Sequence, residues 1–87
     1  MTAQLDILYF AWMREAVGVA QEQVDIPVEV GTVADLAAWL TTRSAGHLAA
    51  LGDSQKLRCA VNQQMAAPDA RLEGAREIAF FPPVTGG

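Results

Sequence analysis

The residues best suited to chemistry stand together at the C-terminal end of the sequence. The chain closes with the run Pro82-Pro83-Val84-Thr85-Gly86-Gly87. Two adjacent glycines lose more conformational freedom on ordering than any other pair, so a tail that merely ends a protein gains nothing from them. They suit a segment that threads a narrow channel in another protein, because no Cβ blocks the walls. Adenylation would turn the Gly87 carboxylate into an acyl phosphate, and sulfur could then replace the adenylate to give a thiocarboxylate.

The rest of the sequence offers few candidates for catalysis. It has no G-x-x-x-x-G-K run, so we expect no ATP site, and it has neither CxxC nor HExxH, so we expect no metal site. His47 lies among small residues with no evident Ser or Cys partner, and we interpret it as a surface histidine. Cys59 lies in an apolar stretch and is expected to fill the core. We therefore expect no active site in the body of the fold and no bound cofactor.

Composition limits the classes of partner. A chain of 87 residues fits one domain, and 52% hydrophobic with 18% charged residues is typical of a globular protein. The net charge of −4 and the scattered basic residues argue against a nucleic-acid partner. These basic residues are Arg14, Arg43, Lys56, Arg58, Arg71 and Arg76. An acidic chain of this size is better matched to a basic protein surface.

Targeting signals are not evident. The opening MTAQLDILYF has no basic lead-in, no apolar run approaches the length needed to span a bilayer, and a single cysteine excludes an internal disulfide. We therefore expect no membrane association and a cytoplasmic location.

The elements that must present the tail can be read from hydropathy periods. Alternation of apolar and polar residues with a period of two predicts strands. Good helix formers before Gly18 predict a short helical turn. Pro27 indicates an edge position or a strand end. Asn62-Gln63 predicts a tight turn. The predicted strands cover residues 5–10, 23–28, 57–62, 65–66 and 77–81, and the helical turn covers 11–17.

One longer helix is predicted in the middle of the chain. Thr32 is a suitable N-cap, and Asp35 adds negative charge to the first turn. Apolar residues at the i, i+3, i+4 and i+7 positions form one stripe over residues 33–40, which Trp39 widens. Residues 45–56 are predicted to be a loop or a short turn of helix.

This order of elements predicts the fold. Two strands, one main helix and then further strands indicate an α+β domain with a ubiquitin-like β-grasp, in which the helix crosses a small mixed sheet of four to five strands. The domain is expected to cover residues 1–81, followed by a flexible tail over residues 82–87.

Several segments of the sequence resemble those of a known family. The final ten residues, IAFFPPVTGG from Ile78 to Gly87, are similar to the C-terminal signature of the molybdopterin synthase small subunit. Leu8-Tyr9-Phe10-Ala11 with Arg14-Glu15 resembles the first strand and turn of that family, and Ala60-Val61-Asn62-Gln63 resembles its central hairpin. One departure is the turn Gly74-Ala75-Arg76-Glu77, where the family has Gly-Asp-Glu; here Gly74 is expected to take the special turn position.

The resemblance implies a sulfur carrier. An ATP-using, E1-like activating enzyme would adenylate Gly87, and a sulfur donor would convert it to a thiocarboxylate. The tail, residues 82–87, would then enter a pocket of the large catalytic subunit and give its sulfur to cyclic pyranopterin monophosphate. The family's synthase is a heterotetramer, and Phe10, Met65 and Phe81 match its apolar contacts with the partner. Strand alternation independently places only one of Phe80 and Phe81 in the core, and we expect Phe81 to face the partner.

Three other functions remain open from the sequence. The chain could carry sulfur for thiamine synthesis or tRNA thiolation, it could be a modifier joined to lysines through the same carboxylate, or it could be an interaction module with an idle tail.

Overall fold

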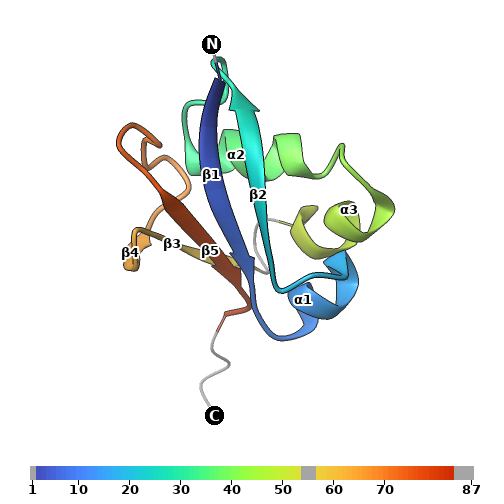
Figure 1. Ribbon diagram of the computed structural model, residues 1–87. Helices are drawn as coiled ribbons and strands as arrows, with labels where there is room; N and C mark the ends of the chain where they lie inside the picture. Colours follow the sequence, from blue (N-terminus) through green and yellow to red (C-terminus); the bar gives the residue numbers. More distant parts are fainter. Residues whose placement is uncertain (1, 54–56, 84–87) are drawn as a thin grey trace.

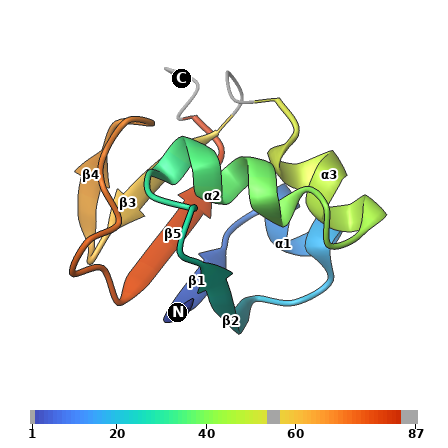
Figure 2. The same cartoon turned by 90° about the horizontal axis from the view of Figure 1, so that it is seen from above.

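A computed structural model describes residues 2–53 and 57–83 of the chain. In chain order the elements are β1 (Thr2–Tyr9), α1 (Trp12–Val17), β2 (Gln21–Pro27), α2 (Val33–Leu40), α3 (Ala45–Leu51), β3 (Arg58–Val61), β4 (Gln64–Ala66) and β5 (Glu77–Phe81). The strands form one sheet and the helices lie on one side of it (Figures 1 and 2).

The sheet is mixed and has the order β2-β1-β5-β3-β4. The two central strands β1 and β5 run parallel, and the other neighbours pair antiparallel. β2 is an edge strand that ends at Pro27, as expected of a residue without an N–H to donate. With the main helix across this sheet, the α+β, ubiquitin-like β-grasp prediction is confirmed.

The core lies between the sheet and the helices. Every second residue of β1 points inward, namely Leu5, Ile7 and Tyr9, and Ile78 and Phe80 do the same on β5. They meet the buried stripe of α2, which consists of Val33, Leu36, Ala37 and Leu40. The helical stripe predicted over residues 33–40 is therefore the buried face of α2, and the period of two explains the inward face of β1 and β5.

The start of α2 is fixed by a capping box. Thr32 Oγ1 accepts a hydrogen bond from the Asp35 backbone N–H, and the Asp35 carboxylate accepts from the Thr32 N–H. The next two N–H groups of the helix donate to the carbonyls of Ala70 and Pro68. The long connection between β4 and β5 is thereby tied to the helix, and Leu72 of this connection is buried.

The turn between β3 and β4 also matches its prediction. Asn62 and Gln63 both have positive φ, of 50° and 71°, and Asn62 Oδ1 accepts from the backbone N–H groups of Arg76 and Glu77. Gly74 has a φ of 80°, so it does take the special turn position in the segment that departs from the family pattern.

Residues 45–51 are more regular than the loop or short turn of helix predicted for residues 45–56. They form the regular helix α3, capped by Ser44, whose Oγ accepts from the His47 N–H. α3 packs against α1 at Gly46, where an added Cβ would overlap the Ala16 carbonyl oxygen. The two short helices can approach this closely only because residue 46 lacks a side chain.

Replacing Gly46 with Ala should destabilise the protein, although alanine is the better helix former. We expect the free energy of unfolding to fall by about 1–3 kcal/mol, because the new methyl group overlaps the backbone of α1. Gly31→Ala is the matched control, since its nearest neighbour, Asp35 Oδ2, would lie at 4.0 Å. Urea unfolding of both variants measures the difference. Equal stability of the two would contradict the close packing at Gly46.

None of the helices in the described part of the chain has the length and apolarity needed to cross a bilayer.

Candidate functional site

The open face of the sheet, on the side away from the helices, carries side chains in register across four strands. Leu8 of β1 lies beside Ala79 of β5, Ala79 beside Ala60 of β3, and Ala60 beside Met65 of β4. This set, which we call the apolar row, crosses the sheet from a central strand to the β4 edge. It follows directly from period-two alternation once the pairing is fixed.

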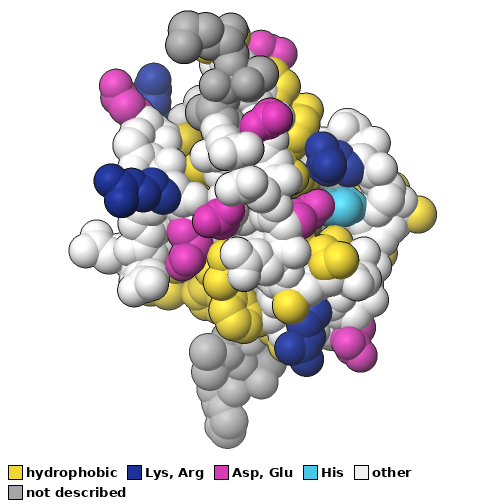
Figure 3. Space-filling view, viewed as in Figure 1, with side chains coloured by type: hydrophobic (Ala, Val, Ile, Leu, Met, Phe, Trp, Pro, Cys, Tyr) yellow, Lys and Arg dark blue, Asp and Glu magenta, His cyan; other side chains and the backbone are white. Residues whose placement is uncertain are grey.

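Two aromatic residues extend the apolar row toward the end where β5 stops. Phe10 directly follows β1, and its N–H donates to the Phe80 carbonyl. Phe81 ends β5 beside Arg58 of β3. Figure 3 shows hydrophobic side chains gathered on the lower part of this face. The apolar row with Phe10 and Phe81 is called the apolar face below.

The structure therefore places the three residues expected at a partner interface on one side of the sheet. Phe10 is 46% exposed and Met65 is 67% exposed. Phe81 is half-buried, whereas its neighbour Phe80 is fully buried against Tyr9. Phe80 and Phe81 therefore point to opposite faces of β5, as predicted from strand alternation. Large exposed apolar side chains grouped in this way are typical of a surface that another protein covers.

The tail begins at this same end of the sheet. Pro82 and Pro83 leave β5 directly after Phe81 and are half-buried. Val84, Thr85, Gly86 and Gly87 lie outside the described residues, so the expectations for these residues stay predictions. What the structure does establish is the point of departure: the tail leaves next to the apolar face.

Acidic side chains border the apolar face at the end away from the start of the tail. Asp6 of β1 and Glu77 of β5 are direct cross-strand neighbours, one step beyond the apolar row. Figure 3 shows acidic side chains above the hydrophobic ones on this face. This arrangement agrees with the net charge of −4 and favours a partner with basic residues around its own apolar surface.

His47 is the clearest correction to the sequence-based prediction. It is only 7% exposed, not a surface residue. Its Nε2 lies 2.7 Å from Glu22 Oε2, and its Nδ1 lies 2.7 Å from Ser44 Oγ. The same Glu22 oxygen accepts a 2.7 Å hydrogen bond from the Tyr9 hydroxyl. Figure 3 shows the single histidine against an acidic side chain.

These four residues, Tyr9, Glu22, Ser44 and His47, form what we call the Glu22 network. Burial alone would raise the pKa of the Glu22 carboxyl, but the hydrogen bonds from His47 and Tyr9 outweigh it and hold that pKa below its ordinary value. Burial, and then the hydrogen bond to Glu22, raises the pKa of the Tyr9 hydroxyl. The network joins β1, β2 and α3. Ser44 also caps α3, because its Oγ accepts from the His47 backbone N–H, so the hydroxyl holds both the start of the helix and the His47 ring.

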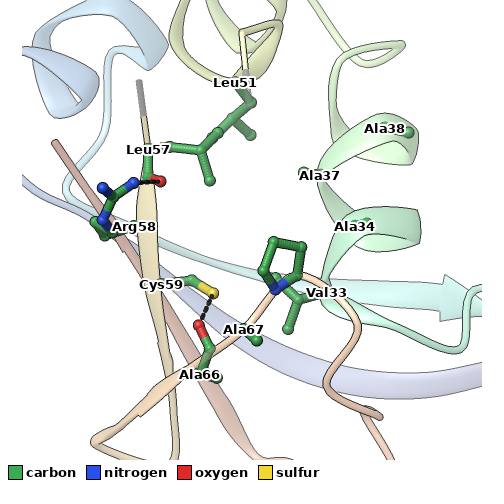
Figure 4. A pocket seen from close by; sticks show the side chains of 11 residues that line it. Val33, Ala34, Ala37, Ala38, Leu51, Leu57, Arg58, Cys59, Ala66 and Ala67 are labelled. Carbon is green, nitrogen blue, oxygen red and sulfur yellow. Dashed lines mark hydrogen bonds between the residues drawn. The ribbon is translucent and has the colours of Figure 1, made fainter. Parts of the chain in front are cut away.

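A pocket of about 350 Å³ lies between α2 and the β3–β4 hairpin. It is lined mainly by small apolar side chains, while Arg58 lies on the far side of β3 and donates to the Leu57 carbonyl (Figure 4). Cys59 borders it, donates to the Ala66 carbonyl, and has a pKa raised by burial. A thiol that is buried and protonated is a weak nucleophile, so Cys59 fills space as expected. Among the described residues, no group of three or more His, Cys, Asp or Glu is placed to hold a metal ion.

Comparison with known proteins identifies the family. The model of the ThiS family matches residues 7–87, which is nearly the whole chain. The chain belongs to the ThiS family. The chain is also similar to the molybdopterin synthase sulfur carrier subunit of Escherichia coli, with 39% identity over 83 residues, covering 95% of this chain and 99% of that protein. The protein of the same name from Haemophilus influenzae is 37% identical over 90 residues, with the same coverage.

Solved structures agree with the ThiS-family fold. SAMP1 from Haloferax volcanii superposes with a TM-score of 0.76 at 26% identity and covers 98% of this chain and 100% of its own. A putative molybdopterin converting factor, subunit 1, from Pyrococcus furiosus has a TM-score of 0.65 at 22% identity, covering 94% of this chain and 99% of its own. The family model and the two relatives named above confirm, at the level of the family, the resemblance noted from the C-terminal signature.

The Glu22 network is a polar cluster of this ThiS-family chain that was not predicted from the sequence. A local signal for part of it existed, because Ser44 stands three residues before His47, the spacing of a helix cap and its N3 residue. No local signal pointed to Glu22, which lies on a strand 25 residues away.

Proposed function

We propose that this chain is the sulfur carrier subunit of a molybdopterin synthase. The observation that carries the proposal is the 39% identity, over nearly the whole of both chains, with a relative that bears this name. The exposed apolar face beside the start of the tail supports it, because a carrier needs a docking surface close to the group that it delivers.

The chemistry proposed for the carrier lies at Gly87. A carboxylate oxygen of Gly87 attacks the α-phosphorus of ATP in an E1-like activating enzyme, and pyrophosphate leaves. A sulfur donor then displaces AMP from the acyl carbon, which leaves a thiocarboxylate. The glycines let this end reach a narrow active site, since neither presents a Cβ.

Delivery of the sulfur is proposed to occur in the large catalytic subunit. The apolar face docks through Phe10, Met65 and Phe81, and residues 82–87 extend into the partner's pocket. The thiocarboxylate sulfur attacks the pterin substrate, cyclic pyranopterin monophosphate, to begin the dithiolene. Two carriers on a large-subunit dimer would make a heterotetramer. Aromatic residues such as Phe81 commonly dominate the affinity of such interfaces.

Intact mass measurement tests the proposal directly. After incubation with ATP, the activating enzyme and a sulfur donor, the chain should gain the mass difference between sulfur and oxygen. Addition of the large subunit and the pterin substrate should return it to its original mass. A chain that never gains this mass under conditions where the Escherichia coli carrier does would contradict the proposal.

A protein modifier is the second candidate, favoured by the likeness to the Haloferax volcanii structure named as a small archaeal modifier protein. The same experiment separates the two functions. A modifier would appear joined to another polypeptide through an amide at Gly87, which withstands thiols, whereas the carrier would appear as the free thiocarboxylate.

A further inference from the structure

Met65 is a residue of the apolar face whose side chain can be oxidised. Its side chain is 67% exposed on β4, an edge strand of only three residues, so its thioether sulfur is open to small reagents. Methionine sulfur is oxidised by peroxides, and the product is a polar sulfoxide.

The other sulfur atoms in the described part of the chain are protected. Met13 is the buried residue of α1 and is fully covered. Cys59 is buried and its Sγ donates to the Ala66 carbonyl. Since burial raises the pKa of the Cys59 thiol, little of the reactive thiolate forms at neutral pH. Among these three atoms, only the Met65 sulfur is both accessible and reactive in its neutral form.

We propose that Met65 is a redox-modification site, and that its oxidation to the sulfoxide weakens docking of the carrier to its catalytic partner. The inference rests on the proposed function, because it requires the apolar face to be the docking surface. It assigns to Met65 a sensitivity that Phe10, the other exposed residue of that face, lacks, since a phenyl ring is not oxidised in this way.

The reaction is a two-electron oxidation by hydrogen peroxide. A lone pair of the thioether sulfur attacks one peroxide oxygen, the O–O bond breaks and an S–O bond forms. The departing hydroxide takes up the proton of the oxygen now bound to sulfur, which gives the sulfoxide and water. A thiol-dependent methionine sulfoxide reductase reverses the change, with two thiols oxidised to a disulfide and the oxygen released as water.

The position of Met65 explains why one oxygen atom matters. Its neighbour across the strand pair is Ala60, followed by Ala79 and Leu8, so the apolar row offers no hydrogen-bond donor to a sulfoxide. Burying an unpaired acceptor on docking is costly, and we expect the dissociation constant to rise about tenfold or more.

The test uses the full-length carrier in its carboxylate form and the purified large subunit. The carrier is treated with hydrogen peroxide and digested with trypsin, which separates Met65, in the peptide of residues 59–71, from Met1 and Met13 in residues 1–14. The oxygen should appear first on Met65. The dissociation constant is then measured by calorimetry before oxidation, after oxidation, and after repair by the reductase.

A Met65→Leu variant is the matched control. Its own affinity before and after peroxide is compared, and the ratio should stay near one while that of the native chain rises and returns on repair. Equal affinity of the native chain before and after oxidation at Met65 would overturn the inference and leave the proposed function intact. Failure of the untreated chain to bind the large subunit at all would instead contradict the proposed function.

Discussion

Removal of Gly87 should abolish sulfur transfer while leaving the fold unchanged. The truncated chain still presents a carboxylate, but it lies one residue short and follows a single glycine, so it no longer reaches the reacting atoms of the activating enzyme or of the pterin. Within residues 2–53 and 57–83, β5 ends at Phe81 and Phe80 is the last residue of the buried core, so we expect the thermal midpoint to be unaltered.

Three measurements on the truncated chain separate the roles of body and tail. Thiocarboxylate formation, followed by intact mass, should fall below detection. Affinity for the large subunit should fall much less, because the apolar face is untouched. A full-length chain with its terminal carboxylate converted to an amide is the matched control, since it keeps both glycines and blocks only the chemistry. Sulfur transfer by either form would contradict the mechanism.

The fold was predictable because its main signals are local. The capping box at Thr32 and Asp35 uses residues three apart, and the turn at Asn62-Gln63 uses two adjacent residues that tolerate positive φ. Alternation along β5 separated Phe80 from Phe81 because side chains of one strand point to opposite faces by geometry alone.

The apolar face was only partly predictable. Period-two alternation showed which residues leave the core, but the order of the strands decided which of them become neighbours. Met65 and Leu8 lie on one row only because β1 pairs parallel with β5, and because β3 pairs antiparallel with both β5 and β4. Such long-range pairing depends on the closure of the whole sheet, and no window of the sequence contains it.

His47 shows the opposite limit. A histidine among small residues in an irregular segment is usually exposed, and local composition supports that interpretation. Its burial depends on an acceptor, Glu22, supplied by a different strand, and on Ser44 at the start of a helix that the sequence indicated only weakly. A buried polar group needs partners, and these partners are set by tertiary structure.

Replacing Glu22 with Ala should cause the largest loss of stability among substitutions outside the apolar core. The substitution leaves the Tyr9 hydroxyl and His47 Nε2 without their shared acceptor, and both side chains are buried. Each unsatisfied donor costs about 1–3 kcal/mol, so we expect the free energy of unfolding to fall by roughly 2–5 kcal/mol. Guanidinium unfolding followed by circular dichroism measures the change. Glu29→Ala is the matched control, because Glu29 is exposed in the turn after β2 and should be nearly neutral.

The pH dependence of stability distinguishes the charge of Glu22 from its shape. The pKa of the Glu22 carboxyl is held below its ordinary value of 4.5 in the folded protein, so near that pH the unfolded chain binds the proton more readily. The stabilisation by the carboxylate is therefore complete well above pH 4.5 and is lost as the pH falls through the lower, folded value. A Glu22→Gln variant keeps the shape without the charge, and its deficit in unfolding free energy relative to the native chain should shrink in acid. A deficit that stayed constant from neutral pH to pH values well below 4.5 would show that the network holds α3 by packing alone.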